Sequence, residues 1–319
     1  MARSPVLCLH MVLFLFVSAP APARAAPGAA NAPTTSDAAC ITPSGIDAHC
    51  YGAAGNGSTD DTAALDRAVS AALATDQPLF LPHGTYMLSR PVVIDYRTRS
   101  DTGFRVVSMG AILDGKTIAR QPVLEIECSG GTAISPKGCF YFNEQGTLFV
   151  NARSDSYAVV IGQGDFSDAQ NSIKIDHLIV NNAGAGARSG GLQLNYVLNA
   201  EIFAVADSAG GAAGIALEQT QISRISGAGS AATKGGAALR IENGYSFANT
   251  IDAMDLEVAP TCLVIDSRNA AHNTFISPYM ACPTAVDASA GNTTRLVNPL
   301  FAGNVKKEFA AAVGVATGP

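Results

Sequence analysis

Short stretches in which apolar and polar residues alternate follow one another along most of the chain, starting near residue 79. This pattern indicates β-strands that bury one face and expose the other. Gly, Asn, Ser and Asp separate the strands, and no long helical period interrupts them. The strands predicted in the first half are Val92–Asp95, Phe104–Val107, Val123–Glu127, Phe140–Phe142, Leu148–Val150 and Tyr157–Ile161.

The second half repeats one unit, which holds a strand, a turn and a polar residue that opens another strand. The first strands of these units are Leu192–Leu194, Ile215–Leu217, Leu239–Ile241, Leu263–Ile265 and Val286–Ala288. The polar residue recurs at intervals of roughly 19 to 29 residues, which is typical of solenoids. Its positions are Asn171, Asn199, Thr220, Asn249, Asn273 and Asn292. Because asparagine tolerates a left-handed backbone and its amides can bond between coils, we expect an asparagine ladder.

Composition supports a stacked coil. The chain has 31 Gly, 7% aromatic residues, no Trp and 14% charged residues, which suits small inner corners and neutral walls. A solenoid also allows a single domain of this length, because its core grows along an axis. We expect the aliphatic residues of each strand to point inward and the polar residues between them to form the outer surface.

One helix is predicted, directly after a glycine-rich turn at residues 52–57. It begins at about Asp60, with Ser58 or Thr59 as the N-cap residue. Asp60 and Asp61 place negative charge at the positive end of the helix dipole. Its apolar stripe, which fits close packing against flat backbone, is Ala64, Leu65, Ala68, Val69, Ala72 and Leu73.

The sequence YGAAGNGSTDDTAAL at residues 51–65, followed by PHGTY at 82–86, resembles a known family. It is similar to the N-terminal entry of the pectate-lyase-like superfamily, and within it to the rhamnogalacturonase/epimerase-like group of secreted proteins. The resemblance implies an all-β fold, a single-stranded right-handed parallel β-helix with an N-terminal capping α-helix. It also implies carbohydrate chemistry, but it does not choose a reaction, because the entry segment is architectural.

The N-terminus has the features of a secretory signal peptide. Arg3 is basic, Val6–Val17 is apolar, and Ala23–Ala25 is an A-x-A cleavage site. The apolar run is shorter than the roughly 20 residues that span a bilayer, so we expect a secreted or periplasmic protein without a membrane span. The expected organisation is a signal peptide at 1–25, a flexible leader at 26–39, the β-helix with its cap at 40–303, and a C-terminal cap or tail at 304–319.

Six cysteines remain once Cys8 is removed with the signal peptide, and an even number in an exported protein predicts disulfides. Since each segment of a solenoid contacts its neighbours, we expect sequential pairs, which are Cys40–Cys50, Cys128–Cys139 and Cys262–Cys282. Metal binding is the weaker alternative, because there is no C-x-x-C motif and the histidines are scattered. We expect no cofactor. Asp165 and Asp168 could bind calcium, although a turn explains them equally well.

Candidate chemistry lies before and within the strands near residues 192, 215 and 239. In polygalacturonase-type relatives this region carries an aspartate trio, a G-H-G histidine and an R-I-K step. Here only Arg240-Ile241 is retained, and Glu242 replaces the lysine. The remaining charged residues are our candidates, with Asp207, Lys234, Arg240 and Glu242 as catalytic residues and Arg188 and Glu218 as substrate-binding residues.

Two kinds of chemistry fit these residues. In a uronate lyase an arginine or lysine abstracts the C5 proton of the sugar, while neighbouring cations neutralise the sugar's carboxylate. In a glycosidase two carboxylates, here on adjacent coils, act as the acid and as the base or nucleophile. Incidental surface ion pairs are the alternative interpretation. Asp176 and His177 are adjacent in a predicted strand, so we expect them to point to opposite faces and not to act together.

The sequence therefore predicts an exported carbohydrate-active protein, a glycoside hydrolase or lyase acting on a pectin- or uronate-type polysaccharide. The alternative is a non-catalytic β-helix that binds glycan or serves as an adhesin-like surface module. The expected partner is a polysaccharide or oligosaccharide, and the chain is a monomer or a trimer. A net charge of −6 without a basic cluster argues against nucleic acid and anionic membranes as partners.

Overall fold

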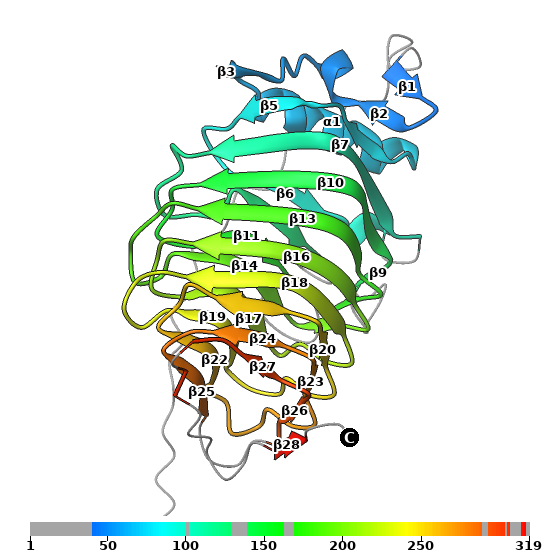
Figure 1. Ribbon diagram of the computed structural model, residues 1–319. Coiled ribbons are helices and arrows are strands. Elements are labelled where there is room, and N and C mark those ends of the chain that lie inside the picture. The colour runs from blue at the N-terminus through cyan, green and yellow to red at the C-terminus, as the bar shows by residue number, and fades with distance from the viewer. Residues whose placement is uncertain are drawn as a thin grey trace, which may run out of the picture. The chain divides into compact units, whose positions relative to one another are not determined.

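The computed structural model describes residues 40–99, 102–128, 139–162, 169–288, 293–303, 305–306 and 314–316. All of them belong to one compact unit, residues 33–319. This unit is a right-handed parallel β-helix in which strands of successive coils lie side by side (Figure 1). The expected signal peptide and leader, the turn with Asp165 and Asp168, Asn292 and most of the expected tail lie outside the described residues.

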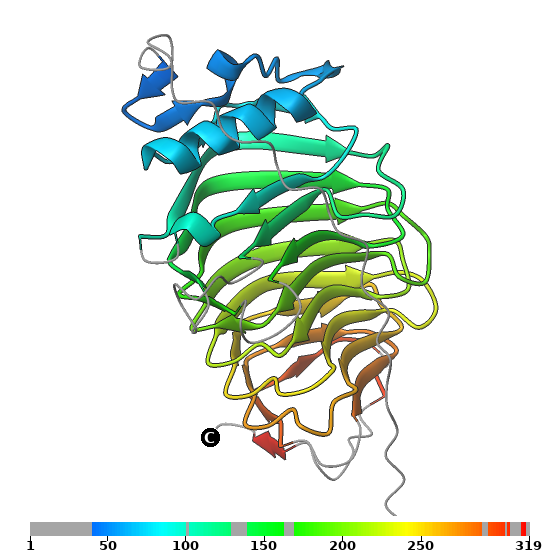
Figure 2. The same cartoon turned by 180° about the vertical axis from the view of Figure 1, so that it is seen from behind.

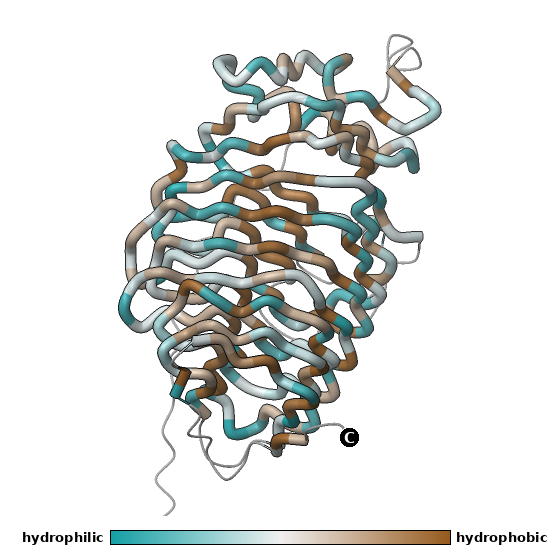
Figure 3. Tube along the Cα trace, in the orientation of Figure 1, coloured by the Kyte–Doolittle hydropathy of each residue, from teal (hydrophilic) through white to brown (hydrophobic). Residues whose placement is uncertain are grey.

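One wall of the coil, sheet B, has the strands that the alternating pattern predicts. Its members are β6 (Val92–Asp95), β8 (Leu124–Glu127), β11 (Tyr157–Ile161), β14 (Gly190–Asn195), β17 (Ala213–Glu218), β19 (Ala237–Glu242), β22 (Thr261–Ile265) and β25 (Thr284–Ala288). The strands pair in register, so one inward row stacks Val92, Leu124, Val159, Leu192, Ile215, Leu239, Leu263 and Val286. Figure 3 shows apolar positions recurring at matching places in successive coils.

The opposite wall, sheet A, holds longer strands than the sequence predicts. The long ones are β7 (Phe104–Gly115), β10 (Phe142–Ala152), β13 (Lys174–Asn182), β16 (Glu201–Ser208) and β18 (Arg224–Ala231). Short strands continue the sheet at the two ends, namely β1 (Ile41–Thr42), β2 (Gly45–Asp47), β3 (Asn56–Asp60), β4 (Leu79–Leu81), β5 (Gly84–Met87), β20 (Thr250–Asp252), β21 (Asp255–Glu257), β23 (Thr274–Ile276), β24 (Tyr279–Ala281), β26 (Arg295–Val297), β27 (Leu300–Phe301) and β28 (Gly314–Ala316).

The coil narrows along sheet A. Two inward rows of this sheet are joined in β7 by the step from Val106 to Ala111. Each of the next three strands covers the same interval with one residue fewer than the strand before it. The corresponding steps are Glu144 to Leu148 in β10, Ile175 to Leu178 in β13 and Ile202 to Ala204 in β16. These β-bulges make the interior widest in the first coils.

Helix α1 (Thr62–Thr75) packs against the wide end of the coil (Figure 2), as the capping helix was expected to do. It begins two residues later than predicted, because Ser58 and Thr59 lie in β3. Asp60 takes the capping role instead, since its carboxylate accepts a bond from the Thr62 N–H at 3.0 Å.

Asp61 is fully buried and has a different role from its neighbour. Its carboxylate accepts bonds from the backbone N–H groups of Ala54 and Gly55 at 2.6 and 3.1 Å. Gly55 has a φ of 59°, a conformation that favours glycine. The glycine-rich turn is therefore held to the start of α1 by one carboxylate.

Sheet C forms the bend between the two walls, with strands β9 (Cys139–Phe140), β12 (Gln170–Asn171) and β15 (Val197–Leu198). The residue after each paired position has a positive φ in every coil of this row, namely Tyr141, Ser172, Asn199, Ile222, Ala248 and His272. The turn thus repeats in conformation, although asparagine fills it only once.

The predicted polar ladder is present in part. Asn249 donates to the Asn273 side-chain oxygen at 3.0 Å, and Asn249 accepts from the backbone N–H of Ser223 at 3.0 Å. Asn199 and Asn171 lie outside this row, because Asn199 occupies the positive-φ position itself and Asn171 precedes that position. Thr220 also lies outside this row, contrary to the prediction, and Ser223 occupies its expected place.

Two of the expected disulfides, Cys128–Cys139 and Cys262–Cys282, are formed. Within the described residues the third pairing, Cys40 with Cys50, is not formed. Cys50 lies exposed on the 3-10 helix Ala48–Tyr51, which turns its side chain toward solvent. The described part of the chain contains no helix with the length and apolar character needed to cross a membrane.

Candidate functional site

An open groove of about 480 Å³ runs over the outer face of sheet B, where the turns from sheet A enter its strands. Three small residues, Ala187, Gly211 and Ala212, belong to its lining. Its polar lining comes from several coils and consists of Arg120, Asp155, Ser156, Tyr157, Arg188, Arg240 and Glu242. We call this the sheet-B groove.

Tyr157 begins β11 and lies across the next coil. A Cβ atom at Gly190 would lie 2.2 Å from its ring, so only glycine fits beneath the phenol. The Tyr157 hydroxyl makes a side-chain hydrogen bond with Glu242 of β19. Burial, with the nearby Glu242 carboxylate, raises the pKa of this phenol, which therefore keeps its proton and acts as a hydrogen-bond donor.

Glu218 and Glu242 end β17 and β19 and are direct register partners on adjacent coils. Both side chains are partly buried on the outer face of the sheet. Burial raises the pKa of each carboxyl group. Glu242 has a cation beside it, because Arg240 and the Tyr157 hydroxyl lower its pKa while the neighbouring acids raise it. Glu218 has a neutral donor instead, since its Oε2 accepts a hydrogen bond from the Gln193 amide at 3.4 Å. The two carboxyl groups thus have different environments.

Arg240 connects the floor of the groove to its edge. Its Nε atom lies 4.0 Å from Glu242 Oε2, and its Nη2 donates to the backbone oxygen of Gly235 at 2.9 Å. Its Nη1 pairs with Asp266 on the next coil. The guanidinium is therefore fixed in place by three partners, and its side chain is only 17% exposed.

Arg188 and Asp155 form the more solvent-exposed side of the groove. The Arg188 Nη2 atom lies 3.2 Å from Asp155 Oδ2, and the Arg188 backbone N–H donates to Asp155 Oδ1 at 3.1 Å. These bonds, the backbone one first, lower the pKa of Asp155. The Arg188 side chain is 73% exposed, so it remains accessible to a ligand from solvent.

The structure brings together some of the residues that the sequence singles out. Arg188, Arg240 and Glu242 line the sheet-B groove, and Glu218 stands beside Glu242. Lys234 lies exposed in the turn next to Gly235, at the rim of this groove but outside its lining.

Asp207 lies elsewhere. It belongs to β16 of sheet A, where it accepts a hydrogen bond from the Ser230 hydroxyl at 2.7 Å. The residues before β17 comprise the end of β16, which includes Asp207, and then the turn. Asp207 therefore lies on sheet A, whereas Arg240 lies on sheet B.

Asp176 and His177 do not point to opposite faces, contrary to our expectation. They fill the bulge of β13 between Ile175 and Leu178, and both are at least partly exposed. The His177 ring packs against Phe203, with the ring centroids 4.5 Å apart. This contact explains the histidine without a catalytic role.

Sequence reasoning missed Tyr157, Asp155 and Arg120. Tyr157 was assigned to a strand, and its partner Glu242 is remote in sequence. The glycine at 190 was the available signal, because it marks a place where another group approaches the backbone. Among the described residues there is no cluster of three or more His, Cys, Asp or Glu side chains that could hold a metal ion.

Comparison with known proteins agrees with the fold. Residues 46–99 match the family model described as rhamnogalacturonase A/epimerase, pectate lyase-like. No curated protein matches the sequence.

Several solved structures share the parallel β-helix. ORF18 of Geobacillus virus E2 aligns with a TM-score of 0.53 at 12% identity, covering 80% of this chain and 52% of that one. The A-module of the mannuronan C-5 epimerase AlgE4 from Azotobacter vinelandii has a TM-score of 0.45 at 12% identity, with coverages of 85% and 95%. The Streptococcus pneumoniae surface protein and adhesin PfbA has a TM-score of 0.45 at 11% identity, with coverages of 85% and 88%. The chain spans about half the length of the viral protein, and at these identities the likeness concerns the fold alone.

Proposed function

We propose that this chain, a pectate-lyase-like parallel β-helix protein, is an exported polysaccharide-active enzyme and specifically a glycoside hydrolase. The observation that carries the proposal is the pairing of Glu218 and Glu242 in register on adjacent coils beside the sheet-B groove. Adjacent strands lie about 4.8 Å apart. Retaining glycosidases place their two carboxyl groups about 5 to 5.5 Å apart.

The environments of the two carboxyl groups suggest their roles. Burial raises the pKa of Glu218, and no cation opposes this effect, which suits the general acid that protonates the leaving oxygen. Glu242 has Arg240 and the Tyr157 hydroxyl to stabilise its negative charge, which suits the nucleophile. Attack by Glu242 on the anomeric carbon breaks the glycosidic bond, and Glu218 donates its proton to the departing sugar. Water then hydrolyses the glycosyl-enzyme, with Glu218 removing the proton of the water.

The proposed export follows from the signal-peptide pattern at 1–25 together with the two disulfides, which persist in oxidising compartments. N-terminal sequencing of the exported protein should find cleavage after Ala25.

The decisive experiment is a screen of the mature protein on pectic, rhamnogalacturonan, alginate and neutral polysaccharides. We expect new reducing ends on at least one substrate, with the product keeping the anomeric configuration of the substrate. Glu218→Gln and Glu242→Gln should each lower kcat by about 10²-fold or more, whereas Glu257→Gln on sheet A should not. A lyase also makes a new reducing end at each cut, but it leaves an unsaturated uronate at the other new end. New reducing ends accompanied by unsaturated uronate absorbance would therefore mean a lyase and would contradict the hydrolase.

A binding module without catalysis is the second candidate. It is favoured by the ion pairs that already occupy Arg188 and Arg240, because those guanidinium groups act as a fixed polar surface. Glycan binding that survives both glutamine substitutions, with no product from the wild type, would establish it.

A further inference from the structure

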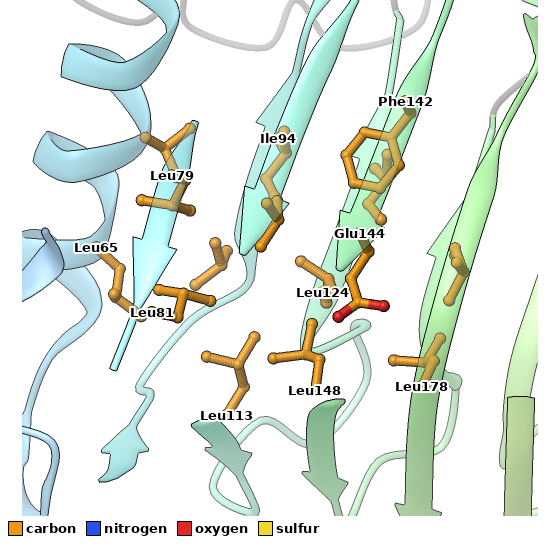
Figure 4. Close-up of a pocket in the computed structure, with 15 residues that line it drawn as sticks. Leu65, Leu79, Leu81, Ile94, Leu113, Leu124, Phe142, Glu144, Leu148 and Leu178 are labelled. Carbon is orange, nitrogen blue, oxygen red and sulfur yellow. The ribbon is translucent and has the colours of Figure 1, made fainter. Parts of the chain in front are cut away.

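A carboxylic acid lies inside the coil. Glu144 of β10 points inward between Phe142 and Leu148, and the residue is only 2% exposed. Figure 4 shows its carboxyl group among leucine side chains from several coils. It faces a closed cavity of about 20 Å³. The other lining residues are all apolar, namely Leu65, Val69, Leu79, Leu81, Val92, Ile94, Val106, Leu113, Leu124, Ile126, Phe142, Leu148, Ile175 and Leu178.

The fold gives a reason for an acceptor here. The bulge in β13 frees the backbone N–H of His177, which donates to Glu144 Oε2 at 3.4 Å. A buried N–H group without a partner is destabilising, so this contact supports the bulge. The other oxygen, Oε1, has no hydrogen-bond partner among the described residues. A water in the cavity would find only this one polar side chain among the lining residues, which is too few to hold it.

No cation compensates the Glu144 carboxyl group. None of the other charged or titratable residues on the surrounding elements lines the cavity. They are Arg105 and Asp114 of β7, Lys174, Asp176 and His177 of β13, Glu125 and Glu127 of β8, Asp95 of β6, and Asp66 and Arg67 of α1. Of these, Asp176 is close enough to act on Glu144, and it carries the same charge. Burial and the Asp176 charge therefore disfavour the ionised form, and the backbone N–H groups of His177 and Asp176 oppose them only in part.

We propose that Glu144 is a pH sensor built into the first coils. Its side chain is neutral in the folded protein at acidic pH, and it destabilises the wide end of the coil once it ionises. The proposal is independent of the function proposed for the sheet-B groove. Its physical basis is the transfer of a carboxylate into an apolar cavity without a counter-charge.

The direction of the pH effect follows from proton linkage. Burial, with a smaller effect of Asp176, raises the pKa of Glu144 from 4.5 to about 7. A raised pKa means that the folded state binds the proton more tightly than the unfolded state. The stabilisation is fully present below about pH 4.5 and is lost as the pH rises through 7. A rise of this size corresponds to a roughly 300-fold fall in the folding equilibrium constant when Glu144 ionises.

The test is denaturant unfolding of the mature protein and of Glu144→Gln between pH 4.5 and 8.5. Glutamine keeps an acceptor for the His177 N–H but cannot ionise. We expect the wild type to lose up to roughly 300-fold in its folding equilibrium constant relative to Glu144→Gln over this range. Glu257→Gln, at an exposed position, should follow the wild type. Parallel pH profiles for the wild type and Glu144→Gln would overturn the proposal.

A second measurement covers the case in which Glu144→Gln does not fold. Burial also raises the pKa of Glu218, Glu242 and Asp255, so these are removed first. In the Glu218→Gln/Glu242→Gln/Asp255→Asn variant, infrared spectra should retain the carbonyl band of a protonated carboxyl group at pH 6 and lose it by pH 8. An ordinary glutamate, with a pKa of about 4.3, is already ionised at pH 6. Absence of the band at pH 6 would show that Glu144 is ionised in the folded protein and would refute the sensor.

Discussion

At the scale of single residues, the contact between Tyr157 and Glu242 shows how a side chain reaches a partner across coils. The phenol passes over a glycine, and its hydroxyl reaches a carboxyl group that burial makes reluctant to ionise. Tyr157 therefore acts on the proton affinity of Glu242. In the proposed hydrolase it is a positioning residue, because its effect on the reaction passes through Glu242.

Tyr157→Phe should shift the pH profile of the enzyme without abolishing catalysis. The hydroxyl lowers the pKa of Glu242, so its removal raises that pKa. Because the nucleophile must be ionised, the acidic limb of kcat/KM should move to higher pH, by up to about one unit for a lost hydrogen bond. The measurement is kcat/KM against pH for both proteins. A uniform loss of activity with an unmoved acidic limb would point to a purely structural role.

At the scale of elements, the turns of the repeat are joined by side-chain bonds that run from coil to coil. Asn249 makes three such bonds, to the backbone oxygen of Thr220, the backbone N–H of Ser223 and the side chain of Asn273. It is 1% exposed. One amide thus satisfies buried groups on the coil before it and the coil after it.

Asn249→Ala should lower the free energy of unfolding by about 2 to 4 kcal/mol, because it leaves buried polar groups on both neighbouring coils without a partner. Asn269→Ala is the matched control, since Asn269 is exposed and its substitution should change stability by less than about 0.5 kcal/mol. Urea unfolding of both variants measures the difference. Equal stabilities would show that the ladder does not contribute.

The two walls differ in how well the sequence predicts them. Sheet B strands such as β6 and β11 match the predicted bounds, because each is a short apolar run rich in β-branched residues. Sheet A was underestimated because β18, with the sequence RISGAGSA, has the composition of a loop. Its strand conformation is dictated by pairing with β16, a contact that a local pattern does not contain.

The candidate site was predicted residue by residue but not as an assembly. Arg240 and Glu242 were found because a known motif passes through them. Asp207 was misplaced because assigning it to a wall requires the exact end of β16. Glu144 gave no signal, since a charged residue in an alternating strand is ordinarily expected on the outside.

At the scale of the whole molecule, the later coils should be interchangeable while the first coils should not. Removing residues 213–236 joins the turn before β17 directly to β19. β19 can then pair with β14 in the register that β17 has in the intact protein. The product should still fold cooperatively, with less stability because one coil of core is gone. It should also lack hydrolase activity, because Glu218 is deleted.

Removing residues 143–173 is the contrasting deletion. It brings β13 against β7, whose step between the same inward rows is two residues longer. We expect this variant to lose cooperative unfolding in circular dichroism. Native-like folding of both variants would mean that the bulges do not restrict which coils can stack.

The narrowing of sheet A also restricts which strands can pair with one another. A solenoid made of near-identical alanine and glycine coils would allow a strand to settle one turn too far along the stack. Here each early strand places a different number of residues between the two inward rows. A displaced strand would therefore have at least one inward side chain out of register with the strands on both sides of it. The graded bulges thus allow only one arrangement of the early strands in which all their inward residues stack in register.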